Sequence, residues 1–311
     1  MSPQLISVVT PCYNEEANVR ELYSRVKAVF AGLPEYRCEH IFIDNASGDG
    51  TVRILRELAK SDPSVKVIVN TRNFGHIRSS YHGLLQGGGD AVIGMASDLQ
   101  DPPEMIPQFL AKWREGFRVV LAIKETSDES RLMFALREWY YRLMARIADV
   151  RIVRQSTGFG LYDKAVMDEL KRIDDPYPFF RGLVAEIGYE HAEIPFRQPL
   201  RRGGSSSQSF STLYDIAFLG IVNHSKAPLR LATMTGFTLA GLSLLVALGY
   251  LVAKILFWSR FELGVAPILI GFFFLSSVQL IFVGIVGEYI GSIYTQVKHR
   301  PLVFERERIN F

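Results

Sequence analysis

Asp98 and Gln100 stand two residues apart, directly after a short apolar run. Side chains two residues apart in an extended segment point to the same side. A carboxylate and an amide oxygen are hard ligands that suit Mg²⁺ or Mn²⁺, with diphosphate oxygens completing the set. The alternative is a plain helix start with Asp101 as its cap and a proline at the first position. That alternative leaves Asp98 unexplained, so we predict a divalent-cation site at Asp98 and Gln100.

Two earlier segments carry carboxylates where a nucleoside could bind. In residues 11–16, Glu15 and Glu16 argue against a bound phosphate, although helix N-termini usually favour anions. Asp44 ends another apolar run and precedes a glycine-rich turn, which suits contact with a base or a ribose. The alternative for the first segment is an acidic helix start capped by Asn14. The alternative for the second is an ordinary turn that uses Gly and Asp for their backbone freedom.

Arg201 and Arg202 open a segment rich in glycine and serine, a short distance before a long apolar run. Guanidinium groups match phosphate oxygens bidentately, and a hydroxyl such as that of Ser205 adds a donor. The alternative is a flexible linker with solvated charges. We predict that this segment binds a phosphate. Arg131 and Arg137, from a basic amphipathic segment, are candidates for the same phosphate.

Strand and helix patterns alternate over the first half of the chain and must position these residues. The patterns predict strands at 5–10, 40–44, 65–70, 91–95 and 119–123, and helices at 14–31, 51–60, 77–86 and 104–115. Such alternation is typical of βαβ units and a mostly parallel sheet. Ligands of these sheets bind outside the carboxyl ends of the strands. The segments 11–16, 44–50, 70–76 and 97–103 are therefore expected to meet at one edge.

Two long runs near the end, 231–253 and 263–287, contain no charged residue. Each exceeds the roughly 20 residues that a helix needs to cross a bilayer. Lys254, Trp258 and Arg260 between them suit an interfacial turn, so the pattern predicts a transmembrane hairpin. A pair of buried core helices is the alternative, but core helices rarely run so long without a charge.

Charge around the two runs predicts their orientation. Lys226 and Arg230 precede the first run, and Lys298 and Arg300 follow the second, which predicts cytosolic termini. The start of the chain does not resemble a signal peptide. The expected organisation is a cytosolic domain (1–208), an amphipathic juxtamembrane helix (209–229), the hairpin (230–295) and a cytosolic tail (296–311), in a bacterial inner membrane.

Net charge and the two cysteines give further expectations about partners and about the core. A net charge of +3 without a basic run gives no reason to expect a nucleic-acid partner. Cys12 and Cys38 are expected to be small core residues of a cytosolic domain.

Taken together, the segments resemble glycosyltransferase family 2 with a GT-A fold. Within it they are similar to the polyprenyl-phosphate glycosyltransferases, such as dolichol-phosphate mannose synthase and the bactoprenol glucosyltransferases. The segments that carry this resemblance are VVTPCYNEE, IDNASGDGT, RNFGH, DLQDPP, STGFGLYD, RRGGSSS and GEYIGSIYTQVKHRP. The resemblance implies nucleotide binding by Pro11, Tyr13, Glu15 and Asp44, metal binding by Asp98 and Gln100, and closure of residues 201–206 over the site.

The function that the resemblance implies is transfer of a sugar, with glucose from UDP expected first, to a polyprenyl phosphate with inversion. The chain departs from the family pattern at Ala96, which replaces a carboxylate, and at Gly158, which replaces the usual acid. Asp163 is expected to be structural. A phosphate monoester is already an oxyanion at pH 7, so a missing base at Gly158 is compatible with a lipid-phosphate acceptor.

Two other functions stay open at this point. One is elongation of a polysaccharide on the same fold, which would need a base for a hydroxyl acceptor. The other is a catalytically weak binding or scaffold module, suggested by Ala96. The sequence also leaves a homo-oligomer open.

Overall fold

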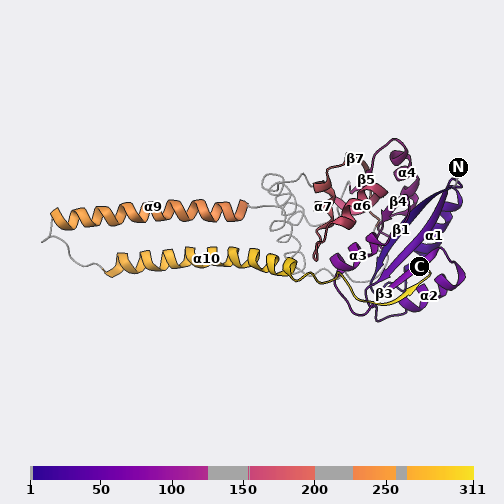
Figure 1. The fold of residues 1–311 in the computed structure, drawn as a ribbon, viewed down its shortest axis with the longest axis horizontal. Helices are drawn as coiled ribbons and strands as arrows, with labels where there is room; N and C mark the ends of the chain where they lie inside the picture. Colours follow the sequence, from indigo (N-terminus) through magenta and orange to yellow (C-terminus); the bar gives the residue numbers. More distant parts are fainter. Residues whose placement is uncertain (1–2, 125–152, 154, 200–226, 257–264) are drawn as a thin grey trace.

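The structure is a computed structural model that describes residues 3–124, 153, 155–199, 227–256 and 265–311. Its centre is an eight-stranded sheet in the order β7-β5-β6-β4-β1-β2-β3-β8 (Figure 1). The strands are β1 (Gln4–Cys12), β2 (Tyr36–Asp44), β3 (Val65–Asn70), β4 (Ala91–Gly94), β5 (Val119–Lys124), β6 (Ser156–Asp163), β7 (His191–Phe196) and β8 (Glu305–Ile309).

Parallel pairing joins the four strands at the middle of the sheet. β1 pairs in parallel with β2 on one side and with β4 on the other, and β2 pairs in parallel with β3. The strand order therefore reverses at β1, which makes the gap between the ends of β1 and β4 the switch point where such sheets bind ligands. The pairs β4–β6, β5–β6 and β3–β8 are antiparallel. The expected mostly parallel α/β sheet is confirmed.

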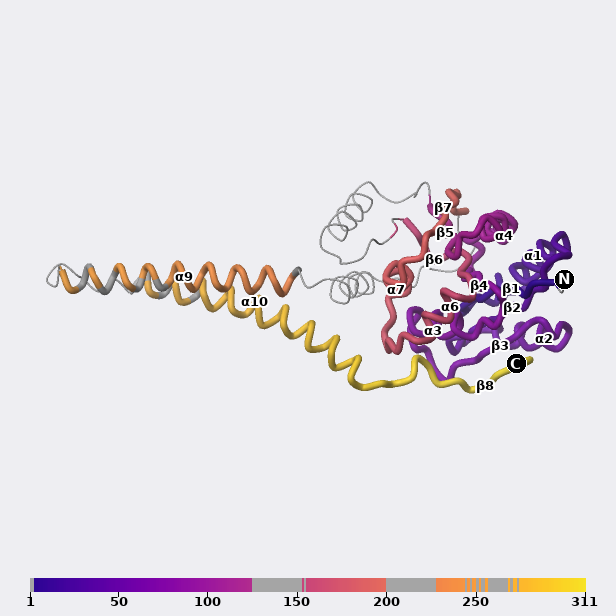
Figure 2. Tube along the Cα trace, turned by 45° about the horizontal axis from the view of Figure 1, so that its top comes forward, coloured from indigo at the N-terminus to yellow at the C-terminus, as the bar shows by residue number. Residues whose placement is uncertain are grey.

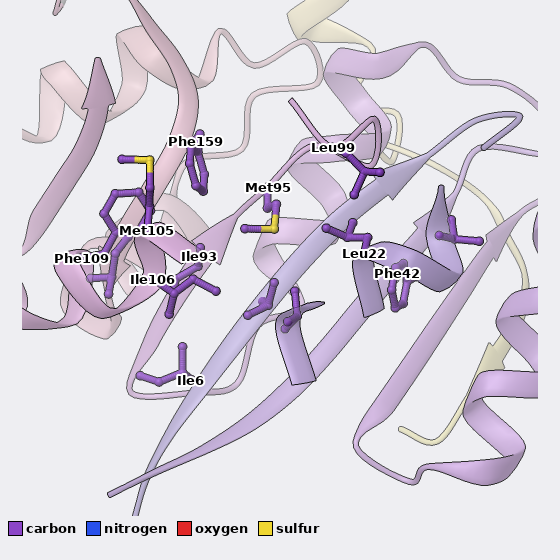
Figure 3. Packing of buried hydrophobic residues seen from close by; sticks show 14 of the residues in the cluster. Ile6, Leu22, Phe42, Ile93, Met95, Leu99, Met105, Ile106, Phe109 and Phe159 are labelled. Carbon is purple, nitrogen blue, oxygen red and sulfur yellow. The ribbon is translucent and has the colours of Figure 1, made fainter. Parts of the chain in front are cut away.

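Helices cover both faces of the sheet, because the central strands are buried on both sides. One face packs against α1 (Val19–Ala31), α2 (Thr51–Ser61), the short 3₁₀ helix η1 (Pro103–Met105) and α4 (Ile106–Arg114). The other packs against α3 (His76–Leu85), α6 (Lys164–Arg172) and α7 (Phe180–Ile187). Figure 3 shows the first core, where Phe109 and Phe159 lie beside Met105 and Ile106.

The expected elements are confirmed within a few residues, with one larger difference. The first helix begins at Val19 and not at residue 14, because residues 13–18 form a loop that contacts the turn after β2.

Two long helices extend away from the domain. They are α9 (Ala227–Leu256, 30 residues) and α10 (Val265–Val297, 33 residues), which lie side by side (Figures 1 and 2). Large apolar side chains on both are solvent-exposed, including Phe237 at 76% and Leu280 at 72%. Within the described residues one segment, Phe274–Val297, is long and apolar enough to cross a membrane. The expectation of two spans is thus not confirmed.

The chain returns to the domain after α10. Residues 296–311 were expected to form a tail, but Glu305–Ile309 is the edge strand β8, paired antiparallel with β3. Arg56 on α2 pairs with Glu307 at 2.5 Å, and the Nδ2 of Asn310 donates to the carbonyls of Ala59 and Val65. These contacts attach the end of α10 to the sheet and cover its β3 edge, which protects an otherwise unpaired strand.

His40 in β2 provides a pH-dependent test of this core. The side chain is 3% exposed, stacks on Phe42 at 3.9 Å between ring centroids, and has its Nε2 3.0 Å from the Oγ1 of Thr10. Burial lowers the pKa of His40 to about 3. The unfolded chain binds a proton on this side chain near pH 6.5 while the native protein does not, so native stability falls as pH drops below that value.

We therefore expect the wild type to lose stability faster than His40→Gln as pH falls from 6 to 4.5, by up to about 1.4 kcal/mol per pH unit. Guanidinium unfolding of the detergent-solubilised protein at several pH values measures the difference. Equal slopes for the two proteins would contradict a buried neutral histidine.

Candidate functional site

The carboxyl ends of β1, β2, β3 and β4 lie along one edge of the sheet. The register aligns Cys12 with Asp44 and Val9 with Gly94. The four loops expected to carry the chemistry therefore start side by side. The candidate site is built from these loops, with the switch point between β1 and β4 at its centre.

The loop after β1 is hydrogen-bonded to the loop after β2. Three consecutive backbone amides of the first loop donate to side chains of the second. These bonds are Asn14 N to Ser47 Oγ (2.9 Å), Glu15 N to Thr51 Oγ1 (2.8 Å) and Glu16 N to Asp49 Oδ2 (3.2 Å). Amides that would otherwise lack a partner are thereby satisfied.

Backbone amides of the second loop also donate to side chains of the first loop. Gly48 N donates to Asn14 Oδ1 at 2.8 Å, and Gly50 N donates to Glu16 Oε2 at 2.7 Å. A Cβ on Gly50 would lie 2.5 Å from that carboxylate oxygen, so a larger residue there would displace the Glu16 side chain. The side chains of Asn14 and Glu16 thus connect the loops. The alternative of Asn14 as a helix cap is wrong, since α1 starts five residues later at Val19.

The residues predicted to bind a nucleotide differ in their exposure. The ring of Tyr13 is 44% exposed at the mouth of the site, where it could stack on a planar ligand. Pro11 is half-buried. Glu15 is 7% exposed, and its Oε2 accepts a 2.6 Å hydrogen bond from Asn18 Nδ2. Only Tyr13 therefore presents a large accessible surface.

Asp44 is fully buried at the end of β2. Ser47 donates to it twice, from its hydroxyl to Oδ1 and from its backbone N to Oδ2 at 3.0 Å. Burial raises the pKa of Asp44, and the bonds from Ser47 oppose that rise. Each carboxylate oxygen can still accept another bond. The side chain orders the turn, and its predicted contact with a base or ribose stays a prediction.

Asn45 connects the second loop to the third, and the sequence analysis did not identify it. Its Nδ2 donates to Asn73 Oδ1 at 2.9 Å, while its Oδ1 accepts from Phe74 N at 2.9 Å and from Asn70 Nδ2 at 3.2 Å. The sequence did contain a signal for this link: Asn45 directly follows Asp44 at the end of β2, and Asn70 stands at the corresponding end of β3. Loop 71–75 is therefore held in register with the β2 loop.

The loop after β4 turns sharply at Leu99, whose φ is +62°. The backbone N of Gln100 donates to Asp98 Oδ1 at 3.2 Å. The segment is thus a turn, and the expectation that Asp98 and Gln100 share one side of an extended strand is wrong. The side chain of Gln100 instead donates from Nε2 to the carbonyl of Pro199 at 3.3 Å.

Asp101 holds this turn from inside. It is 5% exposed, and its Oδ2 accepts from Ala96 N at 2.8 Å. The helix-cap role considered for Asp101 in the sequence analysis is wrong, because η1 starts at Pro103, its cap position is Pro102, and no side chain makes a cap bond there. Burial raises the pKa of Asp101 to about 7, with a further rise from the charge of Asp98.

The donor set near Asp98 suits a cation shared with a ligand. Among the residues the structure describes, no group of three or more His, Cys, Asp or Glu side chains could hold a metal ion by itself. Mg²⁺, however, is commonly bound by one or two carboxylates and completed by substrate phosphates and water. The carboxylate of Asp98 fits that mode. The Oε1 of Gln100, whose Nε2 is bonded to Pro199, is a second candidate ligand, and a cation held there would take its other ligands from the substrate.

Gly158 lies in β6, at the position where the resemblance implied an acid. Its φ is +94°, and a Cβ on Gly94 at the end of β4 would meet its carbonyl at 3.3 Å, so Gly158 borders the site. Asp163 at the other end of β6 accepts from Ala165 N and from Trp113 Nε1, both at 2.7–2.8 Å. It caps α6, so its expected structural role is confirmed.

The residues predicted to bind the acceptor phosphate, four arginines and one serine, lie outside the described residues. They are Arg131, Arg137, Arg201, Arg202 and Ser205.

Comparison with known proteins gives a family match over more than half of the chain. The model of glycosyl transferase family 2 matches residues 7–171. An uncharacterized glycosyltransferase, YkcC of Bacillus subtilis, is 34% identical over 95% of this chain and 91% of its own. The bactoprenol glucosyl transferase of Shigella phage SfV is 35% identical over 95% of this chain and 96% of its own.

The similarity to a solved structure is weaker than the similarity to these sequence relatives. Glucosyl-3-phosphoglycerate synthase from Mycobacterium tuberculosis, solved with Mn²⁺, UDP and glucosyl-3-phosphoglycerate, is 18% identical. Its TM-score is 0.48, over 70% of this chain and 78% of that one.

Replacing Asn45 tests the connection between the second and third loops. Asn45→Ala removes three hydrogen bonds and leaves buried partners unsatisfied, so we expect a loss of roughly 2–4 kcal/mol in unfolding free energy. Asn310→Ala is the comparison, since it also removes two amide bonds but at the exposed end of β8. A smaller effect at Asn45 than at Asn310 would contradict the role of Asn45 as the link.

Proposed function

The chain belongs to glycosyl transferase family 2, and from that we propose that it transfers glucose from UDP-glucose to a polyprenyl phosphate, with inversion. Relatives about 35% identical over nearly their whole length are named bactoprenol glucosyl transferases, which supports both the sugar and the acceptor. The product would be a lipid-phosphate-linked glucose for cell-envelope glycan synthesis.

The observation that carries the proposal is the glycine at position 158. The site borders a residue with no side chain and a backbone φ of +94°, which disfavours an acid there. A sugar hydroxyl needs a base to remove its proton, whereas a phosphate monoester has a second pKa near 6 and is already an oxyanion at pH 7. An acceptor that brings its own negative charge fits this site best.

The transfer balances without an added base. A phosphate oxygen of the lipid attacks the anomeric carbon, a C–O bond forms, and the bond from that carbon to the diphosphate oxygen breaks. The electron pair of the broken bond leaves with the nucleoside diphosphate. Attack from the side opposite the leaving group inverts the anomeric centre, so an α-linked donor gives a β-linked product.

The donor would bind at the loops after β1 and β2. The exposed ring of Tyr13 offers a stacking surface, and Asp44, with Pro11 and Glu15 beside it, supplies buried acceptors for donors on a base or ribose. The hydrogen bonds between the two loops hold these groups before a ligand arrives, which reduces the ordering needed on binding.

Asp98 and Gln100 would hold the divalent cation, either Mg²⁺ or Mn²⁺. When bound, such a cation stabilises the negative charge on the leaving diphosphate. Asp101 fixes the loop by accepting from Ala96 N, and so positions Asp98 without touching the ligand. With Ala96 in place of a carboxylate, the protein supplies less negative charge to the cation and the donor diphosphate supplies more.

The acceptor phosphate would be bound by arginines from two segments, Arg201 and Arg202 with Ser205 on one, and Arg131 and Arg137 on the other. Gln100 donates to Pro199 just before the first of these segments, which supports a location near the site. Charge-assisted bonds of this type contribute about 1.5–3 kcal/mol each.

We also propose that α9 and α10 both cross the membrane, with the domain and both termini in the cytosol. The chain leaves the domain through α9 and returns through α10 to β8, which is part of the same sheet. A chain that starts and ends on one side of a membrane crosses it an even number of times. If Phe274–Val297 crosses, a second crossing is required, and α9 is the helix of sufficient length.

Transfer to purified acceptors tests the proposed function. We expect the full-length protein to convert UDP-[¹⁴C]glucose and polyprenyl phosphate into a labelled lipid in which glucose is β-linked, as read from its NMR coupling. A panel of other nucleotide sugars serves as control. No labelled lipid with any donor, or faster transfer to a free sugar hydroxyl, would overturn the proposal.

Asp98→Asn tests the cation site. It keeps the shape of the side chain but removes the charge, so we expect transfer to fall roughly 100-fold or more with an unchanged melting temperature. The same replacement at the exposed Asp168 of α6 should leave transfer unchanged. Wild-type turnover with full metal dependence in Asp98→Asn would make Asp98 structural.

Cysteine labelling tests the topology. In a Cys38→Ala background, a cysteine added after Phe311 should react with a membrane-impermeant maleimide only from the cytosolic side, and Ser259→Cys only from the other side. Reaction of both cysteines from the same side would rule out two crossings.

A further inference from the structure

Three guanidinium groups, those of Arg72, Arg78 and Arg300, gather where α10 meets the domain, and Lys298 lies two residues before Arg300 with its Nζ over the ring of Tyr294. Arg72 lies in the loop after β3, Arg78 lies on α3, and Lys298 and Arg300 follow the end of α10 at Val297. Arg78 Nη2 donates to the carbonyl of Pro301 at 2.6 Å, which joins α3 to the segment leaving α10. We call these four residues the basic cluster.

The guanidinium groups of the cluster are close enough to affect one another. Burial lowers the pKa of Arg78, and the positive charges of Arg72 and Arg300 lower it further. Phe74 fixes two of them, because the guanidinium carbons of Arg72 and Arg78 lie 4.0 and 5.8 Å from its ring centroid. Phe74 in turn packs against Phe304, just before β8.

The basic cluster has no matching carboxylates within the described part of the chain. None of its four side chains forms an ion pair there, and the Nε of Arg78 is buried without a hydrogen-bond partner. The neighbouring His299 faces Asp174 at 3.3 Å, so that carboxylate is already engaged. On the same tail, Arg308 is paired with Glu305. Collecting like charges without counter-charges is unfavourable unless an anion is supplied from outside.

The position of the basic cluster next to a possible membrane span indicates which anion it binds. Lys298 and Arg300 directly follow Phe274–Val297, the segment able to cross a membrane. Basic residues at that position lie at the level of lipid headgroups, and each gains about fivefold in affinity for an anionic surface. Arg72 and Arg78 extend the same charge onto the domain.

We propose that the basic cluster binds the phosphate groups of anionic membrane phospholipids and so holds the β3 side of the domain against the membrane surface. This inference rests on the part of the proposed function that inserts α10 in a membrane. Loop 71–75 carries Arg72 and is hydrogen-bonded to Asn45 of the candidate site. Lipid binding at the cluster therefore sets the height and orientation of the site above the bilayer.

Native mass spectrometry of the full-length protein tests the proposal. The detergent-solubilised protein is mixed with equal amounts of phosphatidylglycerol, which is anionic, and phosphatidylcholine, which is zwitterionic. We expect the wild type to retain phosphatidylglycerol preferentially, and the preference to fall about fivefold for each charge removed. The cluster variant combines Arg72→Gln, Arg78→Gln and Arg300→Gln.

Two controls separate charge from folding. Arg78→Lys loses the planar guanidinium group but keeps the positive charge, so it should retain the preference for phosphatidylglycerol. The second control removes the same net charge on the far side of the domain and should also retain the preference for phosphatidylglycerol. It combines Arg20→Gln, Arg37→Gln and Arg53→Gln at exposed sites of α1, β2 and α2 (Figure 1). If the triple cluster variant does not fold, Arg300→Gln alone, at an exposed position, carries the test.

Equal preference in the wild type and the cluster variant would overturn the proposal. Competition by polyprenyl phosphate, but not by phosphatidylglycerol, would also overturn it and assign the cluster to the acceptor. Glucose transfer is measured on the same preparations. Transfer without phosphatidylglycerol preference contradicts only this inference, whereas the preference without transfer contradicts only the proposed function.

Discussion

The reciprocal hydrogen bonds between the loops after β1 and β2 are the constraint on which the site depends. Backbone amides of residues 14–16 donate to side chains that follow β2, and the side chains of Asn14 and Glu16 accept from backbone amides of that same loop. Asn45 carries the same connection to the loop after β3. Three strand ends thus form one rigid rim, and the loop after β4, held by Asp101, completes it. Binding can then occur without much ordering of the protein, which preserves affinity.

The C-terminal strand connects this rim to the long helix α10. β8 pairs with β3, and Phe304 packs against Phe74 in the loop that Asn45 holds. The strand begins eight residues after α10 ends, so a short segment joins the helix to the sheet. A membrane-bound acceptor would in this way meet the site at a fixed height.

The sequence predicted the sheet because buried parallel strands appear as apolar runs that end in polar residues such as Asp44 and Asn70. It did not predict the side-chain roles of Asn14 and Asp101, since these depend on positive φ values at Asn14, Ala46 and Leu99 that no periodicity reveals. β8 was missed because Glu305 and Glu307 resemble a solvated tail. Their partners, His82 and Arg56, lie 223 and 251 residues earlier.

In the proposed reaction, the acceptor brings its own nucleophilic charge to a site that is bordered by Gly158 and not by an acid. The direct measurement is kcat/KM for the lipid acceptor as a function of pH, compared between a polyprenyl phosphate and a phosphonate analogue with a higher second pKa. The account predicts a rise with pH that levels near pH 6 for the phosphate. It also predicts that the profile moves to higher pH with the phosphonate. Identical profiles for both acceptors would show that a group on the protein acts as the base, and would contradict the account.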